Sequence, residues 1–158
     1  MPALDRFDKA ILDIVQADNR VTSEALGGRV GLSATACQRR LKRLREAGVI
    51  SADVAILSPE AAGRLLTFVI EVKLERERPE LLAAFKAAMI AADEVMQCYF
   101  VTGQADFILV VTVPDMPAFN AFTERTLLAD ANVKAFHTSV VLDRVKFGLR
   151  VPLGAPAR

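Results

Sequence analysis

The sequence predicts an α+β protein in two parts, a short all-helical part followed by a larger part in which strands and helices alternate. Over residues 5–46, apolar side chains recur every three or four positions, which is the period of amphipathic helices. Over residues 65–145, alternating and short apolar runs are separated by two helical stretches, a pattern typical of strands joined by helices. Charge divides the same way, because residues 1–50 carry nine Lys/Arg against six Asp/Glu.

The composition limits the class of protein further. Of the 158 residues, 53% are apolar and 25% are charged, which excludes a disordered or fibrous chain. Two cysteines cannot form a disulfide framework, so we expect a reducing compartment. The N-terminus lacks the apolar core of a signal peptide, and no apolar run approaches the roughly 20 residues of a membrane helix. We therefore expect a cytoplasmic protein without a membrane partner.

Three helices are predicted within residues 1–50. The first spans residues 5–18, with Asp5 available as its N-cap. A short second helix begins at Thr22 or Ser23, and the tight connection after it ends at Ser33, a strong N-cap candidate for the third helix. Two short helices joined by such a turn predict a helix-turn-helix domain, with or without a wing.

The third helix has an apolar side and a basic side. Residues 29–45 contain six Lys/Arg and no acid, which is typical of a nucleic-acid-binding surface. A charged rim on a structural bundle is the alternative reading of the same pattern. Polar side chains near the start of such a helix reach base edges in the major groove, and later basic ones meet phosphates. Contacts with double-stranded DNA are therefore assigned to Ser33, Thr35, Gln38, Arg39, Arg40, Lys42 and Arg43.

The larger part predicts a linker strand and hinge over residues 51–64, followed by a domain over residues 65–158. Its strands are expected near residues 65–74, 95–101, 106–113 and 133–145. Helices are expected to begin at Pro79 and at Pro114-Asp115, since proline suits the first helical turn. The resulting order, β-α-β-β-α-β, is the ferredoxin-like arrangement.

Burial predicts a partner for this sheet. In the ferredoxin-like arrangement both helices cover one face, yet residues 107–111 and 140–142 are apolar on both faces. A sheet that is apolar on both faces must be covered, and the chain has no further element to cover it. We therefore expect a homodimer that packs sheet against sheet and presents two helix-turn-helix domains to a pseudo-palindromic site.

Several motifs resemble one family in order and in spacing. The run over residues 32–44, followed by Gly48-Val49-Ile50, resembles the recognition-helix signature of the Lrp/AsnC (feast/famine) regulators. Residues 4–12, 101–107 and 113–116 are similar to other segments of that family. The resemblance implies a transcriptional regulator of amino-acid metabolism or transport, modulated by an amino-acid effector, whose dimers assemble into an octamer.

The resemblance also implies an effector site around the turn at residues 102–106. Gly103 would let backbone amides approach a carboxylate, and Asp106 would pair with an α-ammonium group. In the alternative, Gly103 only serves a β-turn and Asp106 only caps it. The effector positions carried over are Phe100, Thr102, Gly103, Gln104, Asp106, Leu128, Ser139 and Val140.

Enzymatic equipment is missing from the sequence. The single histidine, His137, lies in a predicted strand, and there is no Cys/His cluster with metal spacing. There is also no GxGxxG motif and no P-loop. We therefore expect no catalytic residue, metal or cofactor. Two alternative functions are an amino-acid-sensing module without DNA binding and a regulatory subunit of an amino-acid-metabolising enzyme.

Overall fold

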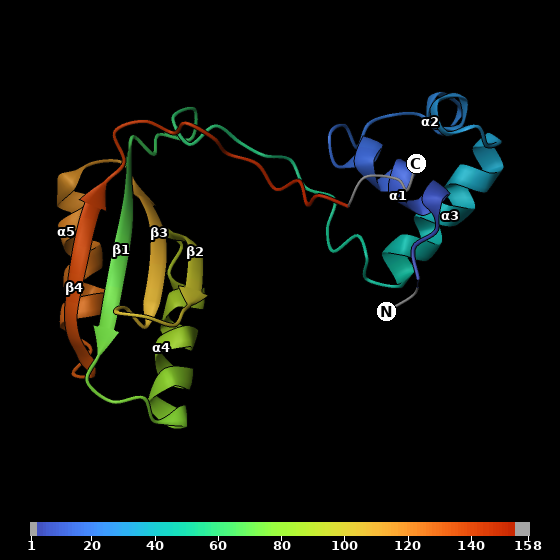
Figure 1. Ribbon diagram of the computed structural model, residues 1–158. Helices are drawn as coiled ribbons and strands as arrows, with labels where there is room; N and C mark the ends of the chain where they lie inside the picture. The colour runs from blue at the N-terminus through green and yellow to red at the C-terminus, as the bar shows by residue number, and fades with distance from the viewer. Residues whose placement is uncertain (1–2, 154–158) are drawn as a thin grey trace. The chain divides into compact units, whose positions relative to one another are not determined.

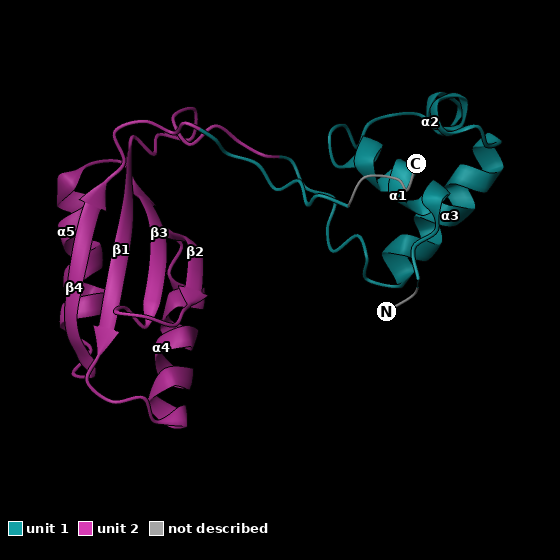
Figure 2. Cartoon of the chain, viewed as in Figure 1, with its two compact units in different colours: residues 1–55, 146–158 teal, residues 56–145 magenta. Residues whose placement is uncertain are grey.

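The computed structural model describes residues 3–153 and divides the chain into two compact units (Figure 2). Unit 1 consists of residues 1–55 together with 146–158, and unit 2 consists of residues 56–145. The sequence assigned everything after residue 64 to one domain. The structure differs, because the segment that begins at Lys146 belongs with the helical unit.

Unit 1 contains three helices, α1 (Arg6–Val15), α2 (Ser23–Val30) and α3 (Ala34–Glu46) (Figure 1). Each begins where a short polar side chain, that of Asp5, Thr22 or Ser33, accepts a backbone N–H three residues further on. These caps and the three helices confirm the sequence prediction. The helices bury a common core made of Ile11, Leu12, Leu26, Cys37 and Leu44.

Two glycines shape the turn between α2 and α3. Gly31 ends α2 with φ of 75°, a left-handed conformation that glycine adopts without strain. Gly27 allows a close approach, because a Cβ atom at this position would lie 2.4 Å from the carbonyl oxygen of Leu32. The turn can therefore fold back onto α2 only when residue 27 has no side chain.

The chain returns to unit 1 after unit 2. The side chain of Gln16 accepts a hydrogen bond from the backbone N–H of Val151 at 2.7 Å and donates one to its carbonyl oxygen at 3.2 Å. Arg150 pairs with Asp13 at 3.1 Å, and Leu153 packs against the helical core. These contacts fasten the returning segment to α1.

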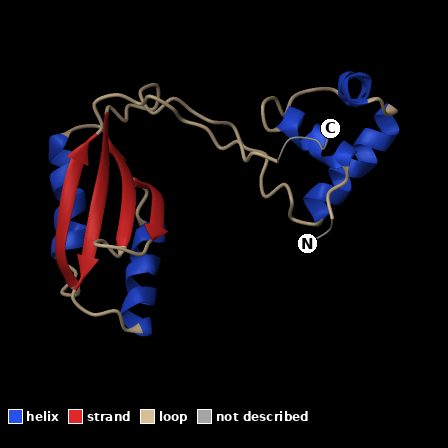
Figure 3. Cartoon of the chain, viewed as in Figure 1, coloured by secondary structure: helices blue, strands red, loops and turns tan. Residues whose placement is uncertain are grey.

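Unit 2 is a four-stranded antiparallel sheet in the order β2-β3-β1-β4, with its helices on one face (Figure 3). This order and the β-α-β-β-α-β succession confirm the predicted ferredoxin-like arrangement. Along the chain the elements are β1 (Leu66–Leu74), α4 (Pro79–Ala91), β2 (Val95–Phe100), β3 (Phe107–Val113), α5 (Met116–Thr123), the π-helical turn η1 (Glu124–Leu128) and β4 (Val133–Val140).

The core of unit 2 lies between the sheet and the helices. Alternate residues of the two central strands face the helices and are fully buried. The ring of Phe68 on β1 stacks on that of Phe119 on α5, with centroids 3.9 Å apart, and Phe85 on α4 contacts Phe107 on β3. This packing fixes both helices against the same face and leaves the other face uncovered within the chain.

Three expectations differ from the structure. No strand forms within residues 51–64, so the predicted linker strand is absent. Unit 1 likewise has no strand among its described residues, so the helix-turn-helix has no wing. The last strand ends at Val140 and not at residue 145, because β1, its only neighbour in the sheet, begins at Leu66 and offers no further backbone partners.

The uncovered face is also less apolar than the sequence pattern indicated. Val69, Ile108 and Val110 form a half-buried apolar strip across the two central strands. Exposed polar side chains, including those of Glu71 and His137, flank this strip.

Replacing Gly27 with alanine should destabilise unit 1 by about 1–3 kcal/mol, the usual cost of overpacking, because the new methyl group meets a backbone oxygen. Gly28 is the matched control, since a Cβ atom there meets nothing within 4 Å. Gly28→Ala should be neutral or stabilising by up to about 1 kcal/mol. Calorimetric unfolding of both variants measures the difference, and equal transition temperatures would contradict the close-approach argument.

Candidate functional site

The exposed side of α3 is the first candidate site. Its apolar side is buried through Cys37 and Leu44, so the opposite side faces solvent. Thr35, Gln38 and Arg39 make no hydrogen bond or ion pair with other described residues, while Lys42 lies 3.8 Å from Glu46 in an exposed pair. These four side chains therefore remain free to contact a ligand.

The other three predicted DNA-binding residues have partners within unit 1. The Ser33 hydroxyl caps α3 by accepting the backbone N–H of Ala36 at 3.2 Å. Arg40 and Arg43 both turn toward α1, where they pair with the carboxylate of Asp8 at 2.8 and 2.6 Å. Arg40 also pairs with Asp5 at 2.8 Å.

Asp8 is the centre of this ion-pair cluster and is only 1% exposed. Its carboxylate also accepts the backbone N–H of Asp5, while the carboxylate of Asp5 accepts the backbone N–H of Asp8. The latter bond, followed by the hydrogen bond from Arg40, holds the pKa of Asp5 below its usual range. The cluster joins the first turn of α1 to the middle of α3.

The sequence analysis missed this role, although a signal for it exists. Asp5 and Asp8 are three residues apart on α1, and Arg40 and Arg43 are three apart on α3. Such pairs lie on one helix face, so two facing pairs of opposite charge are compatible with an interhelical cluster. The basic pattern of α3 alone cannot distinguish this arrangement from a DNA-binding surface.

The turn between β2 and β3 is the second candidate site. It is closed by a hydrogen bond from the backbone N–H of Val101 to the carbonyl of Asp106, and Gly103 has φ of 127°. The carboxylate of Asp106 pairs with Lys73 at 2.7 Å and accepts the backbone N–H of Leu74 at 2.7 Å. Asp106 therefore anchors the turn to β1, and both of its oxygens are engaged. Sequence analysis did not identify Lys73 as its partner.

The charge of Asp106 is stabilised in the folded state. Burial raises the pKa of its carboxyl, but the hydrogen bonds from Lys73 and Leu74 outweigh burial and lower it overall. The anchored turn presents Thr102, Gly103 and Gln104 to solvent.

The structure does not bring the predicted effector positions together within one chain. Phe100 lies on the edge strand β2, half exposed, with the Lys86 ammonium 4.7 Å from the centre of its ring. Ser139 and Val140 lie on β4, at the opposite edge of the sheet. Leu128 is exposed at the end of η1. A pocket that uses all of these positions would require more than one copy of the chain.

No helix in the described part of the chain is long and apolar enough to span a membrane. Within residues 3–153, no group of three His, Cys, Asp or Glu side chains is arranged to hold a metal ion. A helix-turn-helix unit with a basic helix, joined to a ferredoxin-like unit, defines a class of two-domain transcriptional regulators.

Comparison with known proteins identifies the family within this class. Residues 4–45 match the AsnC-type helix-turn-helix domain, and residues 67–151 match the Lrp/AsnC ligand binding domain. The chain therefore belongs to the Lrp/AsnC family. It is a helix-turn-helix transcriptional regulator with a ligand-binding domain, and it is not an enzyme.

Individual relatives cover nearly the whole chain. An uncharacterised HTH-type transcriptional regulator of Sinorhizobium fredii is 53% identical over 95% of this chain and 89% of its own length. The leucine-responsive regulatory protein of Salmonella typhimurium is 37% identical over 90% of this chain and 87% of its own. A transcriptional regulator of Neisseria meningitidis, solved as a complex with L-Met, is 36% identical with a TM-score of 0.89, covering 96% of this chain and 97% of that one.

The anchor at Asp106 predicts a pH dependence for unit 2. Because its folded pKa is lowered, the carboxylate stabilises the fold above the ordinary aspartate pKa of about 3.9 and loses this effect as pH falls through the folded value. Asp106→Asn should therefore lower the unfolding temperature at pH 7, by an amount that shrinks as the pH falls below about 4. Exposed Asp143→Asn is the control, and thermal unfolding at several pH values is the measurement. A constant difference at all pH values would contradict the anchor.

Proposed function

We propose that α3 enters the major groove of double-stranded DNA and that its exposed side reads sequence. The observation that carries this proposal is the separation of roles along the helix. Arg40 and Arg43 are paired with Asp8, whereas Thr35, Gln38 and Arg39 are exposed and without internal partners. A helix about 10–12 Å across fits the major groove, which is roughly 12 Å wide.

The seven predicted DNA-binding residues are assigned different roles in this proposal. Thr35, Gln38 and Arg39 are near enough to the start of α3 to reach base edges, and Lys42 binds phosphate. Ser33 and Arg40 hold α3 in place through the cap and the ion pairs. The Arg43 side chain is 54% exposed, so it remains accessible to a phosphate while it pairs with Asp8.

The uncovered sheet face is the proposed dimer interface. The strip of Val69, Ile108 and Val110, extended by the half-exposed ring of Tyr99, lies on this face. A second copy that packs sheet against sheet would cover the strip and pair two DNA-binding units for a pseudo-palindromic duplex. Further association into an octamer would bring sheet edges of different dimers together.

An amino-acid effector is proposed to bind at the turn 102–104. The regulator of Neisseria meningitidis in the L-Met complex supports this chemical class of ligand. Exposed backbone amides near Gly103 suit the carboxylate, and Phe100 provides an apolar wall. Since Asp106 is engaged with Lys73, we assign it to shaping the turn, and we expect Leu128, Ser139 and Val140 of another copy to complete the site.

DNA binding is tested with duplexes that the protein itself selects from a random pool. Lys42→Ala should weaken binding to all sequences alike and flatten the plot of log K against log salt by about 0.9. Gln38→Ala should instead relax preference at one base pair by about 1–3 kcal/mol. Arg78→Ala in unit 2 is the control for charge. Unchanged affinity and preference in both α3 variants would refute this surface as the interface.

The dimer is tested by charge placed on the strip. Val110→Lys should convert dimers into folded monomers, because an ammonium group buried between two sheets lacks a partner. Ile90→Lys, on an equally apolar but 85% exposed residue of α4, should leave the dimer intact. Light scattering gives the mass, and circular dichroism confirms folding. A folded Val110→Lys protein with the wild-type mass would overturn the proposed interface.

A further inference from the structure

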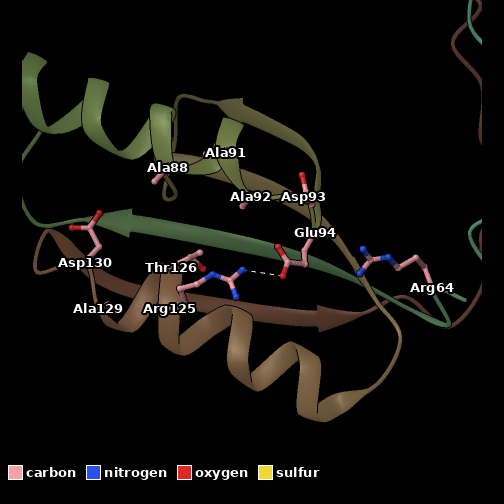
Figure 4. Close-up of a pocket in the computed structure, with 10 residues that line it drawn as sticks. All are labelled: Arg64, Ala88, Ala91, Ala92, Asp93, Glu94, Arg125, Thr126, Ala129 and Asp130. Atoms are coloured by element: carbon pink, nitrogen blue, oxygen red, sulfur yellow. Dashed lines mark hydrogen bonds and ion pairs between the residues drawn. The ribbon is translucent and has the colours of Figure 1, made fainter. Parts of the chain in front are cut away.

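A cavity of about 610 Å³ opens on the helical side of unit 2, between the end of α4 and η1 (Figure 4). Its volume falls within the range of about 300–1,000 Å³ that is typical of small-molecule sites. It lies where β2 begins, whereas the turn 102–106 follows the end of β2. Its lining consists of Arg64, Ala88, Ala91, Ala92, Asp93, Glu94, Arg125, Thr126, Ala129 and Asp130.

Small side chains and a widened helical turn create this cavity. Four alanines, three from the end of α4 and one at the C-cap of η1, line it with methyl groups that leave the space between the helices unfilled. The backbone N–H of Ala129 bonds to the carbonyl of Glu124, five residues earlier, as in a π-helix. Single π-helical turns are frequent at functional sites, and this one carries Arg125 and Thr126.

Two arginines share one carboxylate in the cavity. Arg125 donates to Glu94 at 2.9 Å, and the Arg64 guanidinium approaches the same carboxylate from the other side (Figure 4). Burial raises the pKa of Glu94, but the hydrogen bond from Arg125 and the charges of both arginines lower it overall. Arg64 has only a long hydrogen bond of 3.4 Å, to the carbonyl of Thr112, so most of its donors remain available.

Acidic groups are available in the same cavity. Asp93 is exposed and makes no hydrogen bond or ion pair with other described residues. One carboxylate oxygen of Asp130 accepts the backbone N–H of Asn132 at 2.8 Å, which leaves its other oxygen as an acceptor. The cavity thus offers guanidinium donors, carboxylate acceptors and an apolar wall together.

We propose that this cavity binds a free α-amino acid with a large apolar side chain. The ligand carboxylate accepts hydrogen bonds from Arg64 and from the outer N–H groups of Arg125. Its ammonium group donates to Asp93 and Asp130, and its side chain lies along the alanine methyl groups. Charge-assisted bonds at both ends favour a zwitterion over ligands with one charge. This second site is distinct from the proposed effector site at Gly103 and does not depend on it.

Binding here would act on the beginning of the sheet. The backbone N–H of Arg64 bonds to the carbonyl of Pro59 at 2.8 Å, which closes the turn that precedes β1. A ligand held by Arg64 therefore stabilises that turn. Its position gives the site a route to regulation that is separate from the turn 102–106.

The proposal is tested by calorimetric titration of the full chain with L-leucine, L-methionine and L-phenylalanine. Matched analogues of leucine lack one charge each, namely 4-methyl-2-oxopentanoate and 3-methylbutylamine. At least one amino acid should bind, and for leucine the analogues should bind at least 10-fold more weakly. Labelling alanine methyl groups with ¹³C should show shifts at the four lining alanines. No binding by any of the three amino acids would overturn the proposal.

Variants separate the cavity from other sites. Ala88→Leu fills the cavity and should abolish these methyl shifts, whereas Ala87→Leu, an exposed neighbour outside the lining, should not. Arg64→Gln should weaken binding at least 10-fold, and Gly103→Ala should leave it unchanged. Binding that is lost in Gly103→Ala but persists in Ala88→Leu would overturn the cavity and support the proposed effector site. DNA affinity without ligand should be equal in all four variants, so failure of DNA binding in the wild type would refute only the proposed function.

Discussion

The carboxylate of Asp8 holds the DNA-binding unit together at its most important joint. It is buried in the first turn of α1, yet it pairs with two arginines that belong to α3. A buried charge is tolerated only when it is paired and hydrogen-bonded, so the cluster permits few relative positions of the two helices. The orientation of α3, and with it the direction of every side chain on its exposed face, depends on this constraint.

Local signals in the sequence predicted the helices and the order of the strands well. Asp5, Ser33 and Pro79 mark helix starts by chemistry that acts within one turn, and the alternation in β1 and β3 follows from burial on one face. The linker strand failed because a strand needs a neighbour, which an apolar pattern does not supply. The partners of Arg40 and Asp106 also escaped prediction, since each lies more than 30 residues away.

The two candidate sites differ in how far one chain can complete them. The exposed face of α3 is continuous on one helix, so its geometry is complete in a single copy. The predicted effector positions divide between β2 and β4 because the sheet order places these strands at opposite edges. Sequence can identify such positions by resemblance, but it cannot show that Asp106 is already engaged by Lys73.

Unit 2 interrupts unit 1 in the chain, and this has a consequence for synthesis. The three helices leave the ribosome first, but their contacts with Val151 and Leu153 form only after about a hundred further residues have been made. A nascent chain therefore carries an incomplete helical unit until translation has almost ended. A chain that stops early lacks the closing contacts on α1, so full formation of this unit reports that the sensor between its two ends has also been made.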